Sequence, residues 1–149
     1  MGCDEKKDDQ SSLSEFLPGL RIELRSIGDL VPHEQVIETR IESRIEKLRG
    51  TGFYKPVVVD DHTSTILDGH HKTEASRRLG LERVVVMTVD YLMDQRVAVD
   101  VWPGCGRGQI TKEEVLSMAG SRELFPSKTS RHVFTFKLPD LSIPLEDLR

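Results

Sequence analysis

The sequence predicts an α/β (α+β) fold in which helices are inserted between the strands of a mixed sheet. The runs 57–59 and 84–86 consist of valine, which is typical of strands buried on both faces. Between 37 and 48, isoleucine and leucine recur at steps of four, four and three residues, which indicates one apolar stripe of a helix. Such segments alternate along the 149 residues, so we expect one domain.

The first predicted elements are a strand and a helix, separated by a break at a proline. Segment 20–24 alternates apolar and polar residues, which is the period of a half-buried strand. Pro32 interrupts the pattern within 29–34, because proline restricts its own dihedral angle and that of the residue before it. The helix over 37–48 follows, and Gly50 is expected to cap its C-terminus.

A hairpin, a second helix and a buried strand are predicted next. The apolar runs 56–60 and 65–67 are joined by a turn-rich segment, which favours a β-hairpin. Segment 71–79 has helical character and ends at Gly80. The nearly continuous apolar run over 83–90 then indicates a strand that is buried on both faces.

The second half of the chain adds two strands, a glycine-rich loop and a capped helix. Segment 96–102 alternates valine with other residues, whereas 103–108 contains too much glycine for regular structure. Thr111 and Glu114 form a capping box, in which each side chain covers the backbone N–H of the other residue. A final strand is expected over 133–136.

These elements define the expected domain organisation. We expect 1–19 to be a disordered polar lead-in, 20–137 to form the folded domain, and 138–149 to be a C-terminal extension. The two cysteines, Cys3 and Cys105, provide neither a disulfide framework nor a set of metal ligands. A reduced, cytoplasmic setting is therefore expected.

The charge and the hydropathy pattern exclude several classes of partner. Twenty-one basic and 25 acidic side chains give a net charge of −4, so the chain has no general attraction to nucleic acid or to anionic lipid. The sequence contains no apolar run of membrane-spanning length and no apolar stretch of a secretory signal. A local cationic pocket remains compatible with this composition.

The most informative stretch is the junction between the hairpin and the second helix. Asp68, Gly69 and His70 are expected to form the turn, where exposed N–H groups at the start of the helix make an anion site. Gly69 lets a phosphate approach the backbone, and Lys72 and the histidines add donors. An acid beside a phosphate implies a bridging divalent cation, so Asp68 suggests a magnesium-bound phosphate.

Two other interpretations of this junction are open. In the first, Asp68 caps the helix and the histidines lie on the surface. In the second, His70 and His71 bind zinc, although adjacent histidines rarely point at one metal and no third ligand has suitable spacing.

Four ordered stretches resemble the ParB/sulfiredoxin-like fold and, within it, the free L-serine kinase group. They are LVPHE (30–34), DGHHK (68–72), Trp102 at the end of a strand, and FPSKTSRH (125–132). The resemblance covers about 20–136. It implies phosphoryl transfer from ADP or ATP to the hydroxyl of free serine, with Mg²⁺ as cofactor.

The resemblance also implies roles for individual residues. Glu34 falls where the group has its catalytic base, and a carboxylate there can accept the hydroxyl proton. Asp68 would hold the metal. The implied nucleotide-binding residues are Asp68, Gly69, His70, His71, Lys72, Thr73 and Lys128. The implied substrate-binding residues are Trp102, Thr129, Ser130, Arg131 and His132.

The resemblance leaves alternatives for these residues. Without it, Glu34 would be read as an acid at a helix start, Trp102 as a core residue, and 128–132 as a sheet-edge loop with solvated charges. Lys72 stands where the group usually has arginine, which replaces a bidentate fork with a point charge. The alternative function is a non-catalytic, nucleotide-binding regulatory module of the ParB-like family.

Overall fold

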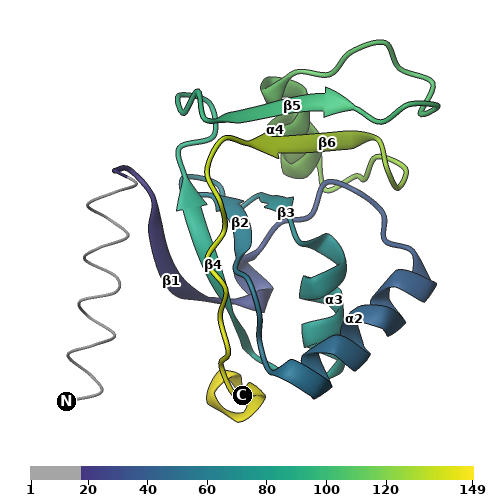
Figure 1. Cartoon of the computed structure of the whole chain (residues 1–149). Helices are drawn as coiled ribbons and strands as arrows, with labels where there is room; N and C mark the ends of the chain where they lie inside the picture. The colour runs from purple at the N-terminus through teal and green to yellow at the C-terminus, as the bar shows by residue number, and fades with distance from the viewer. Residues whose placement is uncertain (1–17) are drawn as a thin grey trace.

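A computed structural model describes residues 18–149 and confirms the predicted α/β class (Figure 1). The strands are β1 (Arg21–Ser26), β2 (Val57–Asp60), β3 (Ile66–Asp68), β4 (Arg83–Val89), β5 (Val97–Val101) and β6 (Ser130–Phe134). The helices are α2 (Glu38–Thr51), α3 (His70–Arg78) and α4 (Lys112–Ser121), with 3-10 turns η1 (Ile27–Asp29) and η2 (Leu145–Leu148). Residues 1–17 of the predicted lead-in lie outside the described residues.

The described strands form a four-stranded mixed sheet and a separate two-stranded sheet. In the larger sheet the order is β1-β4-β2-β3, with β2 parallel to β4 and the other pairs antiparallel. The predicted hairpin is the β2–β3 pair. β5 and β6 pair antiparallel and lie with α4 beyond one end of the larger sheet (Figure 1).

Two hydrophobic clusters lie on opposite faces of the central strands. Val57 and Val59 pack in one cluster with Leu48 of α2, whereas Val58 packs in the other with Val115 of α4. Successive residues of a strand point to opposite faces, so a strand covered on both sides must be apolar at every position. This packing explains the valine run of β2.

Two predicted boundaries were wrong. α2 continues past Gly50 and ends at Thr51, and its C-terminal cap is Gly52, whose φ of +75° requires glycine. The last strand begins at Ser130 rather than at 133, because Ser130 pairs with Val101 in the β5–β6 register. Part of the segment 128–132, which the alternative interpretation made a loop, therefore belongs to a strand.

The C-terminal segment over 138–149 packs against the core. Phe53 and Ile143 exchange two backbone hydrogen bonds, of 2.7 and 3.1 Å. Leu148 is only 1% exposed and lies in the cluster that contains α2. None of the helices within 18–149 is both long and apolar enough to cross a membrane.

The corrected cap of α2 gives a matched pair of substitutions. A Cβ at Gly52 would lie 2.7 Å from the Ile143 carbonyl oxygen, so Gly52→Ala should destabilise the fold by about 1–3 kcal/mol. Gly50 is within the helix and a Cβ there meets no atom within 4 Å, so Gly50→Ala should stabilise by about 0.5–1 kcal/mol. Urea denaturation measures both, and a larger loss at Gly50 than at Gly52 would contradict the observed cap.

Candidate functional site

The junction between β3 and α3 is a single residue, Gly69. β3 ends at Asp68 and α3 begins at His70, so the turn is shorter than predicted. Gly69 has a φ of +113°, and a Cβ there would lie 3.1 Å from the Val57 side chain. No side chain within 18–149 caps α3, so the interpretation of Asp68 as the helix cap was wrong. The first amides of α3 therefore remain available to an external acceptor.

The two histidines that begin α3 attach an upstream segment to the helix. The His33 backbone N–H donates to His70 Nε2 at 3.1 Å, and the Ile37 backbone N–H donates to His71 Nε2 at 3.0 Å. Burial is the main cause that lowers the pKa of both imidazoles, which keeps them neutral. Because each ring accepts through Nε2, its proton is on Nδ1. Nδ1 is thus the atom through which either histidine can donate to a ligand.

Glu34 lies where this upstream segment meets the predicted binding residues of the segment 128–132. Its carboxylate accepts hydrogen bonds from the backbone N–H groups of Lys128 (2.5 Å) and Ser130 (3.2 Å). A parallel bridge between Glu34 and Phe125 aligns the two backbones. Lys128 has a left-handed φ of +59°, and its amide and that of Ser130 both point at the carboxylate. The structure therefore brings Glu34 into contact with residues of the segment 128–132, which is far from it in the sequence.

The Ser130 hydroxyl connects Glu34 to His33. Ser130 Oγ lies 2.7 Å from Glu34 Oε2 and 2.9 Å from His33 Nε2. An ionised carboxylate can only accept, so the one hydroxyl proton goes to Glu34 and His33 Nε2 must donate to Ser130. His33 Nδ1 is then the unprotonated nitrogen, and it has no hydrogen-bond partner within 18–149.

His33 is buried and is the centre of a row of three imidazoles, of which His70 and His132 are half-buried. Its ring centroid lies 4.6 Å from that of His70 and 5.8 Å from that of His132, and His132 Nε2 lies 2.8 Å from the Tyr91 hydroxyl. Burial lowers the pKa of His33 to about 4. The nearby Ile66 carbonyl acts in the opposite direction, although it forms no hydrogen bond with the ring. Burial lowers the pKa of His132 to about 3. The row is therefore uncharged at neutral pH.

Lys72 and Asp68 lie at the same corner but differ in exposure. The Lys72 ammonium is buried and donates to the Lys55 carbonyl at 2.6 Å. Burial lowers the pKa of Lys72 to about 8, although Asp68 opposes the shift. Asp68 is exposed to solvent, yet desolvation by the surrounding protein raises its pKa, with Lys72 opposing. Asp68 is thus the acid that can reach a cation at this corner.

The arrangement does not support the zinc interpretation. Within 18–149 there is no group of three or more His, Cys, Asp or Glu side chains that could hold a metal ion. The Nε2 atoms of His70 and His71 are occupied by backbone N–H groups. A single carboxylate with an open side instead suits a cation that is also bound by phosphate and water.

Trp102 and Arg131 meet on one side of the β5–β6 sheet. Trp102 Nε1 donates to the Ser130 carbonyl at 3.0 Å, and the Arg131 guanidinium lies 5.5 Å from the Trp102 ring centroid. Trp102 is 37% exposed, so it is not the core residue of the alternative interpretation. Because strand residues alternate between faces, Arg131 lies on the opposite face of β6 from Ser130.

Two predicted threonines support the backbone of the site. The Thr129 hydroxyl donates to the Pro126 carbonyl at 2.6 Å, and the Thr73 hydroxyl donates to the Gly69 carbonyl at 2.8 Å. Both side chains are buried. Their hydroxyls stabilise the two turns that carry the Glu34 contacts and the start of α3.

Sequence reasoning missed three residues of this region. His33 lies in the LVPHE stretch, but the sequence predicts no role for it or for Tyr54 and Tyr91. Their importance comes from contacts with residues distant in sequence, such as Tyr91 with His132. The only available signal was that His33 immediately precedes Glu34.

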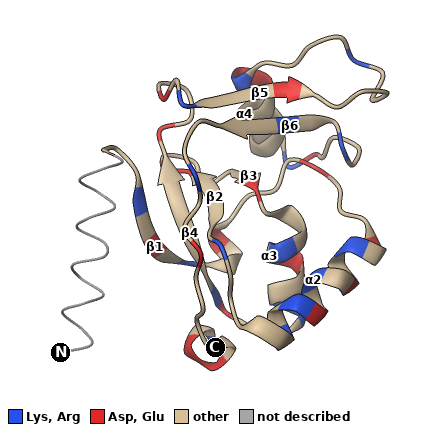
Figure 2. Cartoon of the chain, in the orientation of Figure 1, with Lys and Arg blue, Asp and Glu red and all other residues tan. Residues whose placement is uncertain are grey.

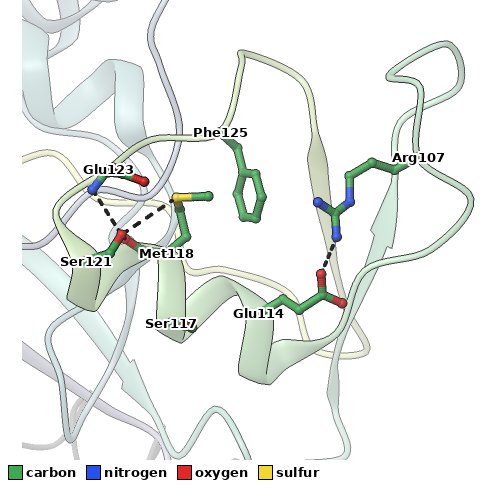
Figure 3. Close-up of a pocket in the computed structure, with 7 residues that line it drawn as sticks. All are labelled: Arg107, Glu114, Ser117, Met118, Ser121, Glu123 and Phe125. Carbon is green, nitrogen blue, oxygen red and sulfur yellow. Dashed lines mark hydrogen bonds and ion pairs between the residues drawn. The ribbon is translucent and has the colours of Figure 1, made fainter.

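A separate shallow groove lies along α4 (Figure 3). Figure 3 shows Arg107 pointing toward Glu114, with which it forms an ion pair, and Phe125 between them and Met118. Its lining residues are Arg107, Glu114, Ser117, Met118, Ser121, Glu123 and Phe125. None of the predicted site residues lines it, so the groove is not the candidate site.

Comparison with known proteins gives sequence relatives but no match to a protein-family model. The chain is 39% identical over 82 residues to a ParB-like protein of Sulfolobus acidocaldarius, covering 55% of this chain and 41% of that protein. It is 30% identical over 94 residues to an ATP-dependent L-serine kinase of Staphylothermus marinus, covering 60% and 37%. It is 31% identical over 91 residues to an ADP-dependent L-serine kinase of Thermococcus kodakarensis, covering 58% and 37%. The matches thus span about two fifths of these relatives.

Solved structures share the fold over most of the chain. A glutamate-to-glutamine mutant of free serine kinase in complex with AMP aligns with a TM-score of 0.78 at 18% identity, covering 86% of this chain and 94% of that one. SbnI with a C-terminal truncation, from Staphylococcus aureus, aligns with a TM-score of 0.73 at 14% identity, covering 86% and 89%. The resemblance to the ParB/sulfiredoxin-like fold and the free serine kinase group is confirmed, and the chain has this fold.

The buried His33 should make stability depend on pH. In the unfolded chain a histidine takes up a proton below about pH 6.5, whereas folded His33 stays neutral down to about pH 4, so stability falls as the pH drops through this window. The slope for one such group is about 1.4 kcal/mol per pH unit, or about 2 kcal/mol between pH 6.5 and pH 5. Urea denaturation of the wild type at both pH values measures the total loss, to which His70, His71 and His132 also contribute because their pKa values are lowered as well.

His33→Gln is the matched variant, because its amide can still donate to Ser130 but does not titrate. The variant should lose less stability than the wild type between pH 6.5 and pH 5. Equal losses would mean that His33 is not held neutral in the folded protein.

Proposed function

We propose that the chain is a kinase that transfers a phosphoryl group from ADP or ATP to the hydroxyl of free L-serine, giving O-phospho-L-serine. Relatives named as ATP-dependent and ADP-dependent L-serine kinases support this proposal, as does the fold shared with free serine kinase. The observation that carries it is the hydrogen bond from the His33 backbone to His70. It holds the segment with Glu34 beside the amides that begin α3.

In this proposal Glu34 is the general base. It accepts the proton of the serine hydroxyl while that oxygen bonds to phosphorus. The bond between phosphorus and the bridging oxygen of the nucleotide breaks, and the nucleotide leaves with one phosphate fewer. Four donors already reach this carboxylate: the backbone N–H groups of Lys128, Thr129 and Ser130, and the Ser130 hydroxyl. In this proposal the long 3.4 Å bond from the Thr129 N–H is lost when Glu34 takes up the proton, and the bonds to Lys128 and Ser130 remain.

The corner at Gly69 would hold the transferred phosphate. The amides that begin α3 and the Nδ1–H groups of His70 and His71 are donors for its oxygens. Asp68 would hold Mg²⁺, which commonly binds one or two carboxylates together with phosphate oxygens and water. The exposed Asp68 carboxylate fits this mode, and Mg²⁺ bound there would offset the charge of the phosphates.

We assign the serine pocket to Trp102 and the segment 129–132, and keep Lys128 among the nucleotide-binding residues. Arg131 points to the opposite face of β6 from the Ser130 side chain that contacts Glu34, so we place its guanidinium at the margin of this pocket, beside Trp102. Thr129 and His132 act through the backbone and Tyr91 rather than by touching serine. Because the net charge is −4, the proposal includes neither nucleic acid nor membranes among the partners. The proposed setting is the cytoplasm.

A non-catalytic, nucleotide-binding regulatory module is the second candidate. Two observations favour it: a relative of 39% identity is named as a ParB-like protein, and the Glu34 carboxylate already has a structural task in capping 128–130. The two candidates differ in what they require of Glu34. A binding module needs its shape and hydrogen bonds, whereas a kinase also needs its basicity.

Glu34→Gln separates these candidates. Because an amide cannot take up the hydroxyl proton, turnover to O-phosphoserine should fall by about 10²–10⁴-fold. Binding of ADP should change little, because the proposal assigns Glu34 to the acceptor hydroxyl. Thermal unfolding checks that the variant is folded, since the amide nitrogen cannot accept the hydrogen bonds of the carboxylate oxygen that it replaces. Mass spectrometry of the product with serine, Mg²⁺ and either nucleotide measures turnover, and calorimetry measures ADP binding.

Glu123→Gln is the control, because it makes the same chemical change in the groove along α4. It should keep wild-type turnover. If folded wild-type protein binds nucleotide but forms no O-phosphoserine with either donor, the kinase proposal fails and the regulatory module is favoured.

A further inference from the structure

Helix α2 carries a stripe of basic residues, whose positions on the ribbon are blue in Figure 2. The stripe consists of Arg40, Arg44 and Lys47, which are four and three residues apart and therefore share one face of the helix. The acids of α2 lie on another face, and they are Glu38, Glu42 and Glu46. Neither the predicted site nor the mechanism above uses the stripe.

This segregation of charge weakens the helix by itself. Like charges four residues apart destabilise a helix by about 0.2–0.5 kcal/mol per pair, whereas a glutamate four residues before a lysine or arginine stabilises it by a similar amount. Arg40 and Arg44 are such a like pair. No side chain of the stripe has an ion-pair partner within 18–149, although Glu38 of the same helix pairs with Arg78. Three basic side chains that share one face of a helix and have no acidic partner there can bind an anion.

Tyr54 provides a second, independent observation. The Lys47 ammonium lies 4.2 Å and the Lys72 ammonium 4.4 Å from the Tyr54 ring centroid, so two cations crowd one ring. The Tyr54 hydroxyl is buried and has no hydrogen-bond partner within 18–149. A phenol hydroxyl that lacks an acceptor, on a ring that two cations face, can donate to a negatively charged oxygen.

The local charge balance is positive although the chain as a whole is negative. Burial is the main cause that lowers the pKa of Lys72, and Arg44, Lys47 and Lys55 lower it further. Asp68 is the acid that opposes them. Arg44 also lowers the pKa of Asp68, so its charge reaches the corner where α3 begins.

We propose that Arg40, Arg44 and Lys47, with the Tyr54 hydroxyl, bind the phosphates of the nucleotide donor that are not transferred. This inference rests on the proposed function, which puts the transferred phosphate at Gly69. The hydrogen bond from Ile37 to His71 brings the start of α2 to that corner. At 1.5 Å per residue, Arg40 to Lys47 spans about 10 Å along the helix, which is enough for more than one phosphate.

Calorimetry with sodium tripolyphosphate and, separately, with ADP tests the stripe. Arg44→Gln removes one charge-assisted hydrogen bond, so both ligands should bind about tenfold more weakly. Arg40→Gln should weaken binding in the same direction without touching Tyr54. Arg49→Gln is the control, because Arg49 is a basic residue of the last turn of α2 outside the stripe, and it should bind like the wild type.

Thermal unfolding of each variant establishes that it is folded before binding is compared. Arg44→Gln binding as tightly as Arg49→Gln, or wild-type protein that binds no tripolyphosphate, would overturn the proposal. Binding is measured without serine and without turnover, so its result does not depend on the kinase assay. A protein that forms no O-phosphoserine but shows the expected loss in Arg44→Gln would refute the kinase and keep the stripe.

Discussion

Two hydrogen bonds from backbone N–H groups to imidazoles hold the candidate site together. His70 and His71 accept from His33 and Ile37, and these contacts fix the segment with Glu34 against the start of α3. A backbone donor is positioned by the whole segment, so its bond to a ring places the neighbouring residues as well. The adjacent histidines thus extend the attachment that begins at Val31, which already pairs with Thr65 just before β3 through a parallel bridge.

This attachment works only while the imidazoles are neutral. A protonated His70 would have no lone pair for the His33 amide, and burial makes such protonation unfavourable. His33 donates through Nε2 to Ser130 and thereby orients that hydroxyl toward Glu34. The imidazoles therefore serve both the attachment of this segment and the geometry of the carboxylate.

Charge in this protein is organised locally rather than globally. A net charge of −4 hides a basic face on α2 and a buried lysine beside Tyr54. Asp68 is the single acid that opposes the pKa shift of Lys72 at this corner, where it can also accompany a cation. Such an arrangement attracts a small polyanion to this corner, whereas the rest of the surface does not attract it.

The sequence by itself determined the elements whose signals are local. The valine runs of β2 and β4, the apolar stripe of α2 and the capping box of Thr111 and Glu114 depend on neighbours a few residues away. Only the tertiary structure decided the cap at Gly52, the start of β6 and the role of His33. Each of these depends on distant partners, such as Ser130, which contacts Glu34 across 96 residues. Periodicity carries no information about which distant groups meet. Those contacts depend on how the packed elements bring distant parts of the chain together.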